Sequence, residues 1–357
     1  MTVTAPGALM DAEIREQPAR WRDLEEELDA IVAAAQWLRD GGLTGVVFLA
    51  RGTSDHAALY GQYLVQLRLG LPVSLATPGI TALRGAIPVP AGHAVIALSQ
   101  SGRSPDLIQT LQAAAKDHPT LSITNDLNSP LASAGHRHLW LRAQAENSVA
   151  ATKSYTAELL TLLLLVEAIA GADRAALVEL LHTAADLADA LMEDAADAGA
   201  RLAEALVATD RLVLIGRGLS MASAKEGALK LMETSAIPAS GWSAADAKHG
   251  PFGQLTDTGC VIALMGAEEL QDSVVDILPI ARLRGAKTVL IGRATQVHAA
   301  ASDENLLEVP VLPDETPDEL LPMLEILPLQ FAALHLSRLR GFDPDRPAGL
   351  SKVTQTR

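Results

Sequence analysis

The chain has 357 residues, of which 49% are hydrophobic and 20% charged, enough for two domains of ordinary size with a large core. Aromatic residues make up only 3%, so we expect a core of Ala, Leu, Val and Ile. A formal net charge of −15 disfavours nucleic acid and anionic membranes as partners. A phosphate on a substrate must therefore be held by short-range donors.

The sequence also argues against a secreted or membrane protein. The single cysteine, Cys260, excludes a disulfide framework and a cysteine-based zinc site within one chain. The N-terminus has no positively charged segment followed by an apolar stretch, so we expect no secretory signal. The longest apolar block, Leu159 to Val166, is far shorter than the roughly 20 residues of a membrane span. We expect a cytoplasmic location.

In chain order, the first 40 residues show helical spacing that ends at Gly41-Gly42. Short apolar runs then alternate with helical segments, which predicts βαβ units and a mostly parallel sheet. The first half contains predicted strands at Gly45–Ala50, Pro72–Thr77, His93–Ser99, Thr120–Asn125 and Arg137–Arg142, and helices near 54–69, 104–117 and 152–170.

A stretch rich in Ala, Leu, Asp and Glu, about 173–208, predicts one or two helices without a strand, after which the alternation resumes. The second half contains predicted strands at Arg211–Gly216, Cys260–Gly266, Lys287–Gly292 and Asn305–Val309, and helices near 219–235, 268–284 and 316–340. The tail from Gly341 is rich in Pro and Asp and is expected to be irregular.

The two halves repeat at an offset of 166 residues. Val46–Ser54 matches Leu212–Ser220, and Ile96-Ala97-Leu98 matches Ile262-Ala263-Leu264. We therefore expect an α/β protein with two tandem doubly wound parallel-sheet domains. The predicted division is a helical N-terminal segment (1–40), a first domain (41–172), a helical linker (173–208), a second domain (209–340) and a tail (341–357).

A loop rich in hydrogen-bond donors follows the predicted strand at His93–Ser99 and opens a helix. It reads Ser99-Gln100-Ser101-Gly102-Arg103-Ser104, at the sheet edge where such folds bind ligands. Hydroxyls and free N–H groups at a helix N-terminus suit a phosphate, and Ser54 is expected at the same edge. The alternative is simple helix capping by Ser101 or Ser104. The second half has Met265-Gly266-Ala267-Glu268 instead, so the predicted repeat is asymmetric.

Candidate acid–base residues lie in the second half. Glu226, Lys230 and Glu233 are spaced to share one face of a helix, and Lys248-His249-Gly250-Pro251 follows. An exposed ion pair and an ordinary turn would also explain these patterns. A carboxylate and a histidine suit aldose–ketose chemistry. The carboxylate can move a proton from C2 to C1 of the sugar, and the histidine can open the sugar ring.

Six motifs, in the same order from about residue 45 to the end, resemble those of the SIS (sugar isomerase) domain family. Within that family the chain specifically resembles the isomerase half of glutamine–fructose-6-phosphate aminotransferase. The resemblance implies two flavodoxin-like domains. The motifs are Gly52-Thr53-Ser54, Ser99-Gln100-Ser101-Gly102, Val149-Ala150-Ala151-Thr152-Lys153, Glu226-Gly227-Ala228-Leu229-Lys230, Lys248-His249-Gly250-Pro251 and Leu350-Ser351-Lys352-Val353-Thr354.

The resemblance also implies roles for these residues. Glu233 would be the base that moves the C2/C1 proton, with Glu226 and Lys230 supporting it. His249 would open the ring, reaching across from a second subunit of a homodimer, and Lys352 matches the lysine that forms a Schiff base with the ketose. The residues implied to hold the phosphate and sugar are Ser54, Ser99, Gln100, Ser101, Ser104 (where the synthase usually has threonine), Val149 and Ala151.

Two departures from the synthase pattern shape the functional expectation. About 40 helical residues precede the first strand, and the only cysteine is Cys260, so no glutaminase domain with its N-terminal cysteine is expected. The tail is also one residue shorter after the lysine, as in stand-alone deaminases. We expect a glucosamine-6-phosphate deaminase that needs no metal or redox cofactor.

Several alternatives remain open at this point. They are a galactosamine-6-phosphate deaminase/isomerase, an N-acetylglucosamine-6-phosphate dehydratase, a fructosyl-amino-acid 6-phosphate deglycase, a synthase with a separate glutaminase partner, and a non-catalytic sugar-phosphate sensor.

Overall fold

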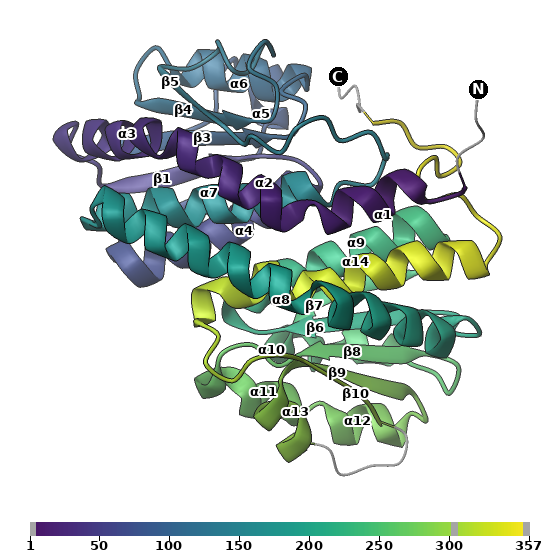
Figure 1. Ribbon diagram of the computed structural model, residues 1–357. Helices are drawn as coiled ribbons and strands as arrows, with labels where there is room; N and C mark the ends of the chain where they lie inside the picture. Colours follow the sequence, from purple (N-terminus) through teal and green to yellow (C-terminus); the bar gives the residue numbers. More distant parts are fainter. Residues whose placement is uncertain (1–4, 301–305, 353–357) are drawn as a thin grey trace. The chain divides into compact units, whose positions relative to one another are not determined.

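The computed structural model describes residues 5–300 and 306–352, whose backbone builds two five-stranded sheets (Figure 1). Contacts divide the chain into two units, each with one sheet. The first unit comprises Glu16–Glu146, Lys153–Leu187 and the described part of Ser351–Arg357. The second comprises the described part of Met1–Arg15, Asn147–Thr152 and the described part of Ala188–Leu350.

The sheet of the first unit is parallel throughout, with the strand order β2-β1-β3-β4-β5. This is the order of flavodoxin-like, doubly wound folds. Its strands are β1 (Gly45–Leu49), β2 (Val73–Leu75), β3 (His93–Ser99), β4 (Thr120–Thr124) and β5 (Arg137–Trp140). The helices are α2 (Gln17–Asp23), α3 (Leu28–Asp40), α4 (Thr53–Leu64), α5 (Gly79–Arg84), α6 (Pro105–Ala114) and α7 (Lys153–Ala170).

Both faces of this sheet are covered, because successive strand side chains point to opposite sides. Figure 1 shows α5 and α6 on one face and α4 and α7 on the other. Val47 and Val95 pack with Leu107 of α6. On the other face, Phe48 lies so close to Gly61 of α4 that a Cβ at Gly61 would meet its ring at 2.8 Å.

The sheet of the second unit repeats the same parallel order, β7-β6-β8-β9-β10. Its strands are β6 (Leu212–Gly216), β7 (Ala239–Ser243), β8 (Cys260–Leu264), β9 (Lys287–Arg293) and β10 (Leu306–Leu312). The helices are α1 (Ala8–Arg15), α9 (Met221–Ser235), α10 (Ala244–Ala247), α11 (Gln271–Val275), α12 (Leu278–Leu283), α13 (Ala294–Ala300) and α14 (Leu321–Leu339).

The expected fold class is confirmed, with two corrections in detail. β7 was not expected, because Ala239-Ser-Gly-Trp-Ser243 has little strand character of its own. The single helix expected near 268–284 is broken into α11 and α12, and α12 begins with Pro279 in its first turn. The stretch 173–208, where one or two helices were expected, forms one, α8 (Arg174–Leu206), and a division between the units falls within it. Asn305 of the last expected strand lies outside the described residues.

One segment, Asp318–Leu339, is long and apolar enough to cross a membrane by length and composition, with a mean hydropathy of 1.4. Inside the protein, however, 94% of its most apolar window is buried. It also carries a fully buried carboxylate, Glu325. The segment is therefore the core helix α14 of the second unit.

Candidate active site

The serine-rich loop of the first unit begins where β3 ends. Ser99 closes the strand and Ser104 immediately precedes α6. Gly102 adopts φ +61°, and a Cβ there would lie 2.2 Å from the Ser129 hydroxyl, so only glycine fits. The Gly102 N–H donates to the Ser99 hydroxyl at 3.1 Å, which closes the turn.

The helix-capping alternative does not describe this loop. Ser104 occupies the N-cap position of α6 without a side-chain capping bond, and Pro105 follows it. The Ser101 hydroxyl accepts from the Arg103 N–H at 3.4 Å, inside the loop rather than in the helix. The Ser101 and Ser104 side chains are both half-buried.

Ser54 lies in the first turn of α4, at the carboxyl edge of β1, which pairs with β3. Its hydroxyl donates to Glu158 of α7 at 2.7 Å. Ser54 is 6% exposed and Glu158 is fully buried. The Ser54 side chain is thus held by a hydrogen bond to the buried Glu158, a residue that the sequence pattern did not single out.

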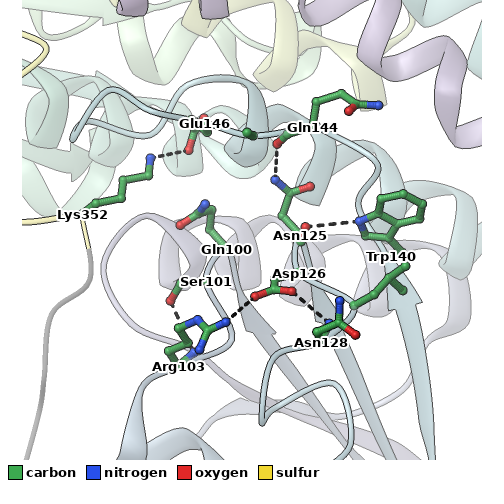
Figure 2. Close-up of a pocket in the computed structure, with 12 residues that line it drawn as sticks. Gln100, Ser101, Arg103, Asn125, Asp126, Asn128, Trp140, Gln144, Glu146 and Lys352 are labelled. Carbon is green, nitrogen blue, oxygen red and sulfur yellow. Dashed lines mark hydrogen bonds and ion pairs between the residues drawn. The ribbon is translucent and has the colours of Figure 1, made fainter.

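A cavity of about 450 Å³ opens beside the loop and brings Lys352 close to it. Gln100, Ser101, Glu146 and Lys352 all line it (Figure 2). The Lys352 ammonium donates to Glu146 at 2.7 Å, and that buried carboxylate also accepts the Ser154 N–H at 3.0 Å. The last two residues of the C-terminal motif, Val353 and Thr354, lie outside the described residues.

The far wall of this cavity is a loop that follows β5 and was not anticipated. Arg142 and Gln144 adopt φ of +49° and +58°, which costs energy for residues with a side chain. Asn125 supports the loop by accepting from the Ala143 N–H at 3.0 Å and donating to the Gln144 carbonyl at 2.6 Å. Figure 2 shows Trp140 donating to the Asn125 carbonyl. The sequence feature that could have predicted this part of the site is Asn125, a polar residue at the carboxyl end of β4.

In the second unit, α9 brings Glu226, Lys230 and Glu233 together as the spacing predicts. The Lys230 ammonium lies 3.2 Å from Glu226 and 2.6 Å from Glu233. Burial alone would lower the pKa of Lys230, but the two carboxylates outweigh it and hold that pKa above its ordinary value. The exposed ion pair considered as an alternative is wrong, because the Glu226 and Lys230 side chains are 0% and 1% exposed. Glu233 remains 25% exposed, so its carboxylate is accessible.

The other predicted residues of the second unit lie on loops. His249 is exposed on the turn after α10, and within the described residues no hydrogen bond joins its ring to the α9 cluster. Gly250, next to it, takes φ +135°, which glycine permits. The half-buried Val149 donates its N–H to the Asp345 carbonyl at 3.1 Å, and Ala151 lies on the same segment, also half-buried.

The carboxyl edge of the second sheet differs from that of the first. Glu325 of α14 accepts from the Gly266 N–H, just after β8, at 3.1 Å. Burial raises the pKa of Glu325 to about 7, although Ser220, Gly266 and Arg293 oppose this. A nearby cavity of about 470 Å³ is lined by Arg293, Gln296 and several residues that include the acidic Glu268, Glu269, Asp314 and Asp318. Among residues 5–300 and 306–352, no three His, Cys, Asp or Glu side chains are grouped so as to hold a metal ion.

Comparison with known proteins identifies relatives over nearly the whole chain. The SIS domain family model matches residues 45–168 and 205–340. Glutamine–fructose-6-phosphate aminotransferase [isomerizing] of Methanothermobacter thermautotrophicus is 31% identical over 345 residues, which cover 95% of this chain and 56% of that protein. The chain thus spans about half the length of the curated relatives it matches.

Two solved structures share the fold. The C-terminal domain of glucosamine-fructose-6-phosphate aminotransferase from Francisella tularensis superimposes with a TM-score of 0.86 at 24% identity, covering 97% of this chain and 100% of that one. Glucosamine-6-phosphate deaminase from Thermotoga maritima gives a TM-score of 0.76 at 19% identity, covering 98% and 100%.

Proposed function

The chain belongs to the SIS domain family, and from this membership we propose that it is a sugar-phosphate isomerase which deaminates glucosamine 6-phosphate to fructose 6-phosphate and ammonia. Its relatives named as aminotransferases [isomerizing] support the isomerase part of the proposal. The identity of the substrate and the release of ammonia are our proposal, because the names of those relatives do not state them for this chain.

The observation that carries the proposal is an amine beside a donor-rich loop. Lys352 and Ser101 line one cavity, and a buried carboxylate, Glu146, holds the lysine there. Hydroxyls and backbone N–H groups at this edge suit a phosphate. An amine held nearby suits Schiff-base formation with the carbonyl of an open-chain sugar. Together they suit a site for a phosphorylated ketose or amino sugar.

In the proposed chemistry, His249 assists ring opening to the aldehyde. Glu233 takes the C2 proton, while O1 gains a proton, and returns a proton to C1, which leaves a ketimine at C2. Water adds to C2, and the C2–N bond breaks to release ammonia and fructose 6-phosphate. Lys230, held between two carboxylates, keeps the Glu233 carboxylate oriented.

The test is an assay of this chain alone with glucosamine 6-phosphate, galactosamine 6-phosphate and N-acetylglucosamine 6-phosphate. Ammonia is measured enzymatically and the sugar products by mass. Ammonia with fructose 6-phosphate from the first substrate is the expected result. Loss of one water from the acetylated sugar would replace the proposal with a dehydratase, and turnover of none of the three would reject deamination.

Matched variants assign the base. Glu233→Gln should lower kcat by about 10²- to 10⁴-fold with little change in KM, the usual contribution of a general base. Glu204→Gln, an exposed carboxylate on α8, serves as the control and should leave both constants unchanged. Full activity of Glu233→Gln would reject the assignment.

We also propose that the enzyme is a homodimer in which His249 acts on the partner's substrate. Mixing inactive Glu233→Gln with inactive His249→Ala should then restore part of the activity, because mixed dimers contain one intact site. No recovery after subunit exchange, or a monomer by light scattering, would contradict this.

A further inference from the structure

The motif Val149–Lys153 ends in a buried lysine for which the proposed function gives no role. Lys153 is the first residue of α7 and is 1% exposed. Burial disfavours an ammonium group, and so does the N-terminus of a helix, where the backbone dipoles carry a partial positive charge. Contacts of the Lys153 side chain must therefore compensate for its position.

The Lys153 ammonium has two such contacts in the first unit. It donates to the carboxylate of Glu16, which precedes α2, and to the backbone carbonyl of Ala145 at 2.7 Å. Ala145 lines the cavity beside the serine-rich loop. Lys153 thus ties the wall of this cavity to the start of α7 and to Glu16.

The next residue, Ser154, holds the next position of the same wall. Its N–H donates to Glu146 Oε1 at 3.0 Å, and its hydroxyl donates to Glu146 Oε2 at 2.7 Å. Lys352 donates to the same Oε2 at 2.7 Å, as a dashed line in Figure 2 shows. Ser154 is 1% and Glu146 6% exposed, so water competes little for these bonds. Two bonds from one residue fix the plane of the Glu146 carboxyl group, and with it the direction in which Lys352 is held.

From these contacts we propose that Ser154 is a positioning residue for Lys352, and that Lys153 holds the backbone on which this positioning depends. Both act through Ala145 and Glu146 and not on the substrate itself. The inference rests on the proposed function and deepens it, because it names the residues that direct the amine toward the sugar carbonyl.

The step that this positioning affects is the formation of a Schiff base. The Lys352 ammonium first loses a proton, which the Glu146 carboxylate in contact with it can accept. The neutral amine then adds to the C2 carbonyl of open-chain fructose 6-phosphate, and one water leaves to give the imine. An amine that is not held in the direction of the carbonyl reacts more slowly, because fewer of its orientations are productive.

The test traps this imine. The full chain is incubated with fructose 6-phosphate and sodium cyanoborohydride, and labelling of the Lys352 peptide is followed by mass spectrometry. Ser154→Ala should lower the maximal labelling rate about tenfold, the loss of one hydrogen bond to a charged group. Ser154→Thr keeps the hydroxyl and should restore most of the rate. Thr161→Val removes a fully buried hydroxyl about two turns further along α7 and should label at the wild-type rate.

The dependence on fructose 6-phosphate concentration separates positioning from general damage to the site. In Ser154→Ala the half-saturating concentration should stay within about twofold of wild type, because the serine-rich loop is untouched. Ser154→Cys, with a weaker donor of similar size, should give an intermediate rate and serves if the alanine variant does not fold. An unchanged maximal rate in Ser154→Ala, or a rate that Ser154→Thr does not restore, would overturn the inference.

Labelling of Lys352 does not require the release of ammonia, so the two proposals can fail separately. Slowed labelling in Ser154→Ala without ammonia from glucosamine 6-phosphate would reject the deaminase and keep the role of Ser154. Ammonia release with equal labelling of wild type and Ser154→Ala would do the reverse. A wild-type protein in which Lys352 is not labelled at all would reject the Schiff base and this inference with it.

Discussion

Replacing Glu325 with glutamine should change how the stability of the protein depends on pH. Glu325 is fully buried on α14, and one of its oxygens accepts the Gly266 N–H. Arg293 and Asp318 are the charged groups that influence the carboxyl. Burial is the largest effect and raises the Glu325 pKa from 4.5 to about 7.

The sign and size of the effect follow from this difference in pKa. Between pH 4.5 and about 7 the unfolded chain has released the proton that the folded protein still holds, so stability falls as pH rises. Below this interval both states are protonated, and above it both are ionised. At about 1.4 kcal/mol per pH unit, the loss across the interval amounts to about 3 kcal/mol. Glutamine carries no such proton, so Glu325→Gln should lack this loss.

The assay is urea unfolding of wild type and Glu325→Gln at intervals from pH 4.5 to 8. The difference in unfolding free energy should change by about 3 kcal/mol in favour of the variant as pH rises. A constant offset between the proteins reflects the altered hydrogen bonds and does not enter the test. Glu204→Gln, an exposed carboxylate on α8, controls for the loss of one acidic group. Parallel curves for wild type and Glu325→Gln would refute the reasoning.

Three further substitutions or measurements test other buried features. Gly102→Ala should destabilise the protein by about 1–2 kcal/mol in urea, because of its positive φ and the 2.2 Å approach to Ser129, whereas Gly253→Ala, with open space around it, should be tolerated. Lys230→Met should cost about 3–5 kcal/mol of unfolding free energy by leaving buried carboxylates uncompensated. Cys260, whose pKa burial raises to about 12, should react with Ellman's reagent at pH 8 only after unfolding, and rapid labelling of the native protein would contradict this.

The sequence predicted most of the sheets because their strands are buried on both faces. His93–Ser99 and Thr120–Thr124 are continuous apolar or β-branched runs, which is the pattern of parallel strands. β7 has no such run and exists because it pairs with β6 along its whole length. Gly241 at its centre lets the backbone of α9 approach, since a Cβ would lie 2.4 Å from the Lys225 Cα. Packing of this kind cannot be read from a local pattern.

The candidate site was predictable where spacing fixes geometry. Glu226, Lys230 and Glu233 meet because residues three and four apart share a helix face. Their burial was not predictable, since an exposed face would have the same spacing. Glu146 and Glu158 reach the serine loop or its neighbours from other segments of the first unit. No local pattern marks them, because their partners are 206 and 104 positions away in sequence.

The two sheets share one strand order, but the buried carboxylate at each carboxyl edge has a different hydrogen-bond partner. In the first, the carboxylate behind the edge, Glu158, takes a serine hydrogen and leaves the loop after β3 to its own hydroxyls. In the second, Glu325 takes the Gly266 N–H, which is therefore occupied and unable to serve an external anion. The buried carboxylate of each copy thus engages a different donor at the carboxyl edge of its sheet. We therefore expect the two copies to present different donors to a ligand, although their strand order is the same.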